Sequence, residues 1–156
     1  MKMQGKVLAP PEPEVIVVPR SNGDNLIFQA GAVLDYAFFD ENIKQPVPPR
    51  VIRPGQPEGL PDEKDPKYVA AVTDFGKKRF HYMILKSLES TPGLEWETVN
   101  MADSETWSNY ESELKASGFT NIEINRIIGG VMTAQGLDDD RIREARESFF
   151  ASRLKQ

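Results

Sequence analysis

The chain has 156 residues, a formal net charge of −5 and a pI of about 5.0. This length suits one ordinary domain with an appendage, and the acidic balance argues against general nucleic-acid binding. The absence of cysteine excludes disulfides, thiolate metal sites and cysteine nucleophiles. No run of about 18 apolar residues is present, so we expect no transmembrane helix and a cytosolic location.

Proline divides the chain into two unlike parts. Eleven of the twelve prolines precede Lys67, and proline breaks helix interiors because it lacks a backbone donor. We therefore expect three consecutive segments: an N-terminal arm over residues 1–43, a Pro-rich linker over 44–65 and a helical domain over 66–156.

A β-hairpin is expected in the N-terminal arm. Val15–Val18 is β-branched and suits a short strand. The turn signal Asn-Gly lies within Ser21–Asn25, and a second apolar run follows over residues 26–30. An isolated hairpin is marginal in water, so it needs a surface to pack on. The adjacent Phe38 and Phe39 either pack on the C-terminal helices or bind another protein.

The linker contains the stretch PVPPRVIRPGQPEGLP, residues 46–61. Its composition favours extended or polyproline II geometry. We expect it to tether the hairpin arm to the helical body and to hold the arm where it can reach a neighbouring molecule.

Four helices are expected after the linker. Apolar residues recur at three- and four-residue steps from Pro66 to about Ser90, and a second helix is expected from about Asp103 to Gly118. The third begins at the capping box Thr120–Glu123, in which a hydroxyl residue is followed three positions later by Glu.

The fourth expected helix opens with Asp138–Asp140 and turns Ile142, Ala145 and Phe149 inward. The predicted fold class is therefore mainly α: a C-terminal bundle of about four helices, preceded by a small N-terminal β-hairpin and a Pro-rich strap.

Residues suited to catalysis or metal binding form no recognisable constellation. His81 is the only histidine, and Asp138–Asp140 is better explained by capping and by the helix dipole than by a metal. We therefore predict no enzymatic activity, no catalytic residue, no metal and no cofactor. Each glycine of Gly129–Gly130 costs about 1 kcal/mol within a helix, which indicates close approach by another helix or a local kink, and we favour the close approach.

Several short runs in the C-terminal half follow one pattern. They are Asp65–Tyr68, Phe80–Leu85, Thr91–Trp96, Glu105–Trp107, Ala116–Thr120, Glu123–Ile124 and Gly136–Asp138, followed by Ile142–Ala145 and Phe149. Across about residues 65–150 this pattern resembles the small helical proteins of long-tailed bacteriophages that are described as tail assembly chaperones.

The resemblance implies a non-enzymatic protein that coats the tape-measure protein, keeps its apolar faces from aggregating and helps to recruit tail-tube subunits. We accordingly expect the tape-measure and/or tail-tube protein as partner, no nucleic acid and no membrane, and we leave a homo-oligomer open. A helical bundle can offer a groove to an amphipathic helix. The apolar residues that we regard as candidates for partner contact, with core packing as the alternative for each, are Phe38, Phe39, Phe80, Met83, Trp107 and Tyr110.

Two other functions stay open at this stage. The chain could be a structural minor tail or connector component of the virion, or a small phage protein that binds a host protein. The expected location is the host cell cytoplasm, with the virion as the location of a structural component.

Overall fold

The computed structural model describes residues 1–153, which form two compact units. Among the described residues, unit 1 consists of residues 1–32, 87–94 and 118–153, and unit 2 of residues 33–86 and 95–117. Each unit is thus assembled from segments that are distant in the sequence, whereas the sequence analysis divided the chain into consecutive parts.

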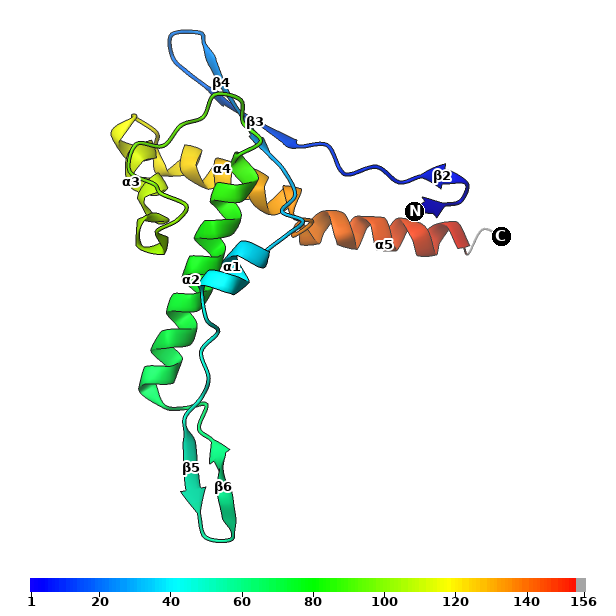
Figure 1. Ribbon diagram of the computed structural model, residues 1–156. Coiled ribbons are helices and arrows are strands. Elements are labelled where there is room, and N and C mark those ends of the chain that lie inside the picture. The colour runs from blue at the N-terminus through cyan, green and yellow to red at the C-terminus, as the bar shows by residue number, and fades with distance from the viewer. Residues whose placement is uncertain (154–156) are drawn as a thin grey trace. The chain divides into compact units, whose positions relative to one another are not determined.

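The fold is mixed α/β, and the prediction of a mainly α protein is wrong. Helices hold 45% of the chain and strands 17%, and the described strands form three antiparallel hairpins where the sequence predicted one (Figure 1). The hairpins are β1 (Lys2–Met3) with β2 (Lys6–Val7), β3 (Glu14–Pro19) with β4 (Asn25–Ala30), and β5 (Arg50–Arg53) with β6 (Gln56–Pro61).

The helices follow the predicted order more closely than the predicted lengths. The first expected helix is confirmed as α2 (Pro66–Leu88) and the third as α4 (Asn121–Ala134), but the second is divided into the short 3-10 helix η1 (Ser104–Thr106) and α3 (Asn109–Ala116). A further short helix, α1 (Ala37–Asn42), precedes the linker. The last helix is α5 (Asp139–Arg153).

Two predicted helix starts are confirmed by their capping bonds. The Asp65 carboxylate accepts a hydrogen bond from the N–H of Tyr68 at 2.9 Å. At the start of α4 the Thr120 hydroxyl accepts from the N–H of Glu123 at 3.2 Å, while the Glu123 carboxylate accepts from the N–H of Thr120 at 2.8 Å. Both arrangements satisfy donors that the first turn of a helix leaves without a partner.

The core of unit 1 lies between the β3–β4 hairpin and α4. Alternate residues of the hairpin face α4. Their side chains are buried together with side chains of α4, of Phe119 just before it and of Leu88 at the end of α2. These buried residues are Ile16, Val18, Phe28, Ala30, Leu88, Phe119, Ile124, Ile127 and Val131. The predicted hairpin is confirmed, and α4 provides the surface that it needs.

Gly130 allows the closest approach within this core. A methyl group at Gly130 would overlap the side chain of Ile16 of β3, whereas one at Gly129 would meet nothing within 4 Å. The expectation that a helix approaches the glycine pair is therefore wrong, because the approaching element is a strand and only one of the two glycines is needed for it.

Unit 2 is built around an aromatic core. Phe39 of α1 lies against three other rings, with centroid separations of 5.3 Å to Phe75, 5.5 Å to Tyr82 and 6.0 Å to Trp107. Tilted and edge-on pairs at such separations are favourable beyond their buried area. The buried Tyr110 and Leu114 of α3 complete this core.

Within the Pro-rich stretch, residues 50–61 form a hairpin, so the expected extended geometry is confirmed for its two strands, whereas their pairing was not predicted. Pro54-Gly55 provides the turn, since proline presets its first central position and Gly55 has φ of +82° at the second. Pro57 and Pro61 are tolerated in β6 because each strand of a two-stranded sheet has a free edge, where a missing N–H breaks no ladder bond.

The inward orientation predicted for the fourth helix is wrong. None of the residues of α5 is buried, and Ile142 and Phe149 are exposed. Among the described residues, no helix combines the length and the apolar character needed to cross a membrane.

Candidate protein-binding surfaces

Most of the partner-binding candidates chosen from the sequence lie in the interior of unit 2. The side chains of Phe39, Met83, Trp107 and Tyr110 are buried, so they are not available for contact with a partner at the protein surface. The Trp107 indole donates a hydrogen bond to the carbonyl of Met101 at 3.3 Å, which satisfies its one polar group. In this structure these four residues have the core role that the sequence left as the alternative.

Phe38 is the one candidate of the six that is exposed. Its ring keeps 44% of its surface accessible and stacks on Tyr82, with centroids 6.3 Å apart and planes 10° apart. Beside it, the Arg79 guanidinium lies 4.3 Å from the centroid of the Tyr36 ring and 3.3 Å from a carboxylate oxygen of Asp40. Phe80 of α2 is half-buried.

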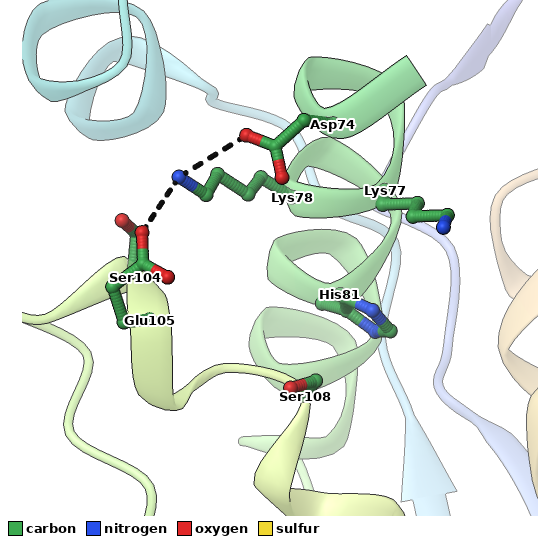
Figure 2. A pocket seen from close by; sticks show the side chains of 7 residues that line it. All are labelled: Asp74, Lys77, Lys78, His81, Ser104, Glu105 and Ser108. Atoms are coloured by element: carbon green, nitrogen blue, oxygen red, sulfur yellow. Dashed lines mark hydrogen bonds and ion pairs between the residues drawn. The ribbon is translucent and has the colours of Figure 1, made fainter. Parts of the chain in front are cut away.

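A small polar pocket of about 200 Å³ lies beside α2 in unit 2. Figure 2 shows the Lys78 ammonium between two carboxylates, 3.3 Å from Asp74 and 2.9 Å from Glu105. The hydrogen bond to Glu105 raises the pKa of Lys78, and burial of the amine opposes this only in part. Lys78 is therefore a paired cation and a poor base or nucleophile.

His81 lines the same pocket. Its Nδ1 lies 3.2 Å from the Tyr110 hydroxyl, which also lies 3.4 Å from a carboxylate oxygen of Glu111. Burial lowers the pKa of His81, and burial together with the nearby Glu111 raises the pKa of Tyr110. Both pKa shifts favour the neutral forms of these side chains. His81, Tyr110 and Glu111 therefore form a hydrogen-bonded contact between α2 and α3. Within residues 1–153 no group of three or more acidic or histidine side chains is placed to hold a metal ion.

The outer face of the β3–β4 hairpin is apolar, although it points away from the core of unit 1. Val15 and Val17 of β3 keep 58% and 44% of their surface exposed, and Ile27 of β4 keeps 53%. Val17 and Ile27 are directly opposite in the register, as are Val15 and Gln29. We call this surface, formed by Val15, Val17 and Ile27, the outer valine face.

Each strand of this hairpin has an outer edge, and on β4 one position of that edge is covered. Gln29 of β4 directs its N–H and C=O away from β3, where the Thr91 hydroxyl binds both at 2.8 and 3.0 Å. Because antiparallel pairs alternate, Val15 and Val17 direct their N–H and C=O groups away from β4. The edge of β3 therefore offers main-chain donors and acceptors next to the outer valine face.

Sequence reasoning missed this face but had a signal for it. The run Val15-Ile-Val-Val18 is apolar at every position, whereas a strand with one solvated face alternates. Such a run indicates a strand with two apolar sides. Of these four residues, Ile16 and Val18 are buried in unit 1, whereas Val15 and Val17 are exposed.

Comparisons of this chain with family models, with curated proteins and with solved structures find no match.

Proposed function

We propose that this chain is a non-enzymatic factor of bacteriophage tail assembly that binds the tape-measure protein and/or the tail-tube protein during tail morphogenesis. The proposal rests on the resemblance of residues 65–150 to tail assembly chaperones. The structural observation that supports it best is the outer valine face with the open edge of β3 beside it.

This surface suits a partner that offers many similar segments. Main-chain hydrogen bonds along a strand edge depend little on the side chains of the strand that is added. The outer valine face then supplies apolar contact, because each exposed β-branched side chain that a partner covers contributes about 1 kcal/mol or more. A surface of this kind can hold different segments of one long partner and release each of them.

The outer valine face also provides the variants that test the proposal. Val17→Lys combined with Ile27→Lys places two charges on the face without touching the core of unit 1, since both side chains are already exposed. The matched control is Val47→Lys, which alters a valine that is 83% exposed and lies outside the hairpin. Each variant is co-expressed with the tape-measure protein and, separately, with the tail-tube protein of the same phage.

The expected result is that the wild-type chain and the control co-purify with at least one tail protein and raise its soluble amount. The double-lysine variant should bind about tenfold less, because a partner would have to desolvate two ammonium groups. If wild type binds neither tail protein, the proposed function fails. If wild type and the double-lysine variant bind equally, the function stands but the outer valine face is not its site.

A further inference from the structure

The apolar side of α5 is uncovered in unit 1. Ile142 and Phe149 are seven residues apart and therefore share one side of the helix, about 10 Å from each other along its axis. Phe149 and Phe150 keep 55% and 56% of their surface exposed, with ring centroids 5.6 Å apart. A helix of this length is marginal in water by itself, so α5 has reason to be covered by another surface.

A hollow lies at the beginning of the same helix. It has a volume of about 590 Å³, which is roomy enough for an aromatic ring, and Ile142 and Ala145 of α5 form one wall. Pro11, Ala32 and Ala134 are among the residues on its other sides. Thus α5 carries a pair of aromatic rings near its end and borders a hollow of mixed apolar and polar lining near its start.

We propose that α5 is the interface of a homodimer in which two copies of the helix pair in antiparallel orientation. With Ile142 opposite Phe149 of the partner subunit, Ala145 lies at the centre of the seam. Each aromatic pair then comes next to the hollow of the other copy. Such an interface is self-complementary and closes with two-fold symmetry. It is independent of the proposed role in tail assembly.

The charges of α5 favour this orientation. The helix begins with Asp138–Asp140 and ends with Arg153. When Ile142 and Phe149 occupy the a positions of a heptad, Asp139 and Arg153 are both at e positions, which face each other in an antiparallel pair. A parallel pair would place the two acidic starts side by side.

One like-charge contact is present in this arrangement. Arg146 is also at an e position and comes close to Arg146 of the partner subunit near the two-fold axis. The adjacent Glu147 offsets this contact in part. Two Asp139–Arg153 contacts per dimer outnumber it, and the antiparallel helix dipoles are favourable too.

The test is sedimentation equilibrium of the full chain at low salt, with wild type, Phe149→Asp and Ile122→Asp. Ile122→Asp is the matched control, because Ile122 is an exposed apolar residue of α4 in the same unit. Wild type and the control should dimerise with equal affinity, and Phe149→Asp should dimerise about a hundredfold more weakly, as expected for the loss of an aromatic anchor.

Charge exchange tests the orientation. Asp139→Arg and Arg153→Glu should each weaken self-association about tenfold at low salt, because each creates two repulsive contacts per dimer. An equimolar mixture of these two variants should form heterodimers at wild-type affinity. In such a heterodimer the arginine introduced at position 139 meets the glutamate introduced at position 153, and the unchanged Asp139 and Arg153 keep their contact.

Three results would overturn the inference. One is a wild-type chain that stays monomeric up to about 1 mM, which would assign the face to a different protein. Another is a dimer that Phe149→Asp leaves unchanged. The third is a mixture of the charge variants that associates no better than either variant alone.

Discussion

In unit 2 the side chain of Glu113 fixes the loop that contains Glu97 and Thr98. From α3 its carboxylate accepts hydrogen bonds from the N–H groups of Glu97 and Thr98, at 2.9 and 2.6 Å, and from the Thr98 hydroxyl. Desolvation by itself would raise the pKa of Glu113, but the hydrogen bonds from Thr98 and Glu97 outweigh it and the pKa is lowered from the usual 4.5. The ionised form therefore stabilises the loop.

This lowered pKa predicts a pH-dependent effect of Glu113→Gln. A carboxylate with a depressed folded-state pKa contributes stability that is fully present above the unfolded-state pKa and is lost as pH falls through the folded-state value. At pH 7 the variant should unfold at a midpoint a few degrees lower, corresponding to about 1 kcal/mol. Thermal melts from pH 7 to pH 3 should show the difference shrinking below about pH 4.5.

Glu95→Gln is the control for this series, because it changes a nearby exposed acid without altering the loop's anchor. A difference between wild type and Glu113→Gln that is the same at pH 3 and pH 7 would contradict the ionic account of the loop.

The residue types in the sequence identified the important large side chains, but they did not predict where those side chains lie in the fold. Phe39, Trp107 and Tyr110 stood out in the sequence as large apolar residues, with core and surface roles both open. The structure places all three in the core of unit 2, because rings from α1, α2 and α3 converge there. No local pattern shows that convergence, since it depends on the path of the chain between these elements.

At the scale of elements, local signals predicted the starts and turns best. The capping box at Thr120 and the expected helix start at Pro66 are confirmed, because the capping bonds at each lie within four residues. The Asn-Gly hairpin is confirmed for the same reason. The β5–β6 hairpin was missed because its prolines were interpreted by composition, although Pro54-Gly55 is itself a turn signal.

The two adjacent glycines of α4 give a test of strand-on-helix packing. Gly130→Ala should lower the free energy of unfolding by about 1–3 kcal/mol, because the new methyl group overlaps Ile16 in a filled core. Gly129→Ala meets open space and should raise it by up to about 1 kcal/mol, since alanine favours the helix. Urea unfolding of both variants measures the two changes.

The pair acts as its own control, because the same substitution is made one residue apart on one helix. Equal effects of the two alanines on stability would contradict the close approach of β3 to α4 at Gly130.

The hydrophobic period predicted a stripe on α5 but not what covers it. Ile142, Ala145 and Phe149 have the spacing of a buried face, and the sequence interpretation placed that face inside the chain. The structure leaves it exposed. Hydrophobic periodicity shows that a helix has an apolar side. It does not show whether that side packs against the same chain or against a second molecule.

At the scale of the whole molecule, the division into units was not accessible from the sequence. Unit 1 joins β3 and β4 to α4, about a hundred residues later in the chain. Residues from three distant segments also meet at the carbonyl of Gly31, which accepts hydrogen bonds from Ser87 at 2.7 Å and from Gln135 at 2.9 Å. Composition divides a chain only into consecutive parts, and so it cannot predict this pairing.

The proposed function rests on a resemblance in the sequence, and the sequence predicted the exposed apolar surfaces only in part. Of the six candidate residues, Phe38 is exposed, whereas the exposure of the outer valine face and of the apolar side of α5 is seen only in the structure. Both surfaces are apolar and lie in unit 1.

The most direct test of the proposed function is quantitative mass spectrometry of purified phage particles beside a lysate of the producing cells. A transient assembly factor should be abundant in the lysate, present in tail assembly intermediates and absent from finished particles. Recovery from the particles at a fixed copy number would contradict the proposal and would make the chain a structural component of the virion.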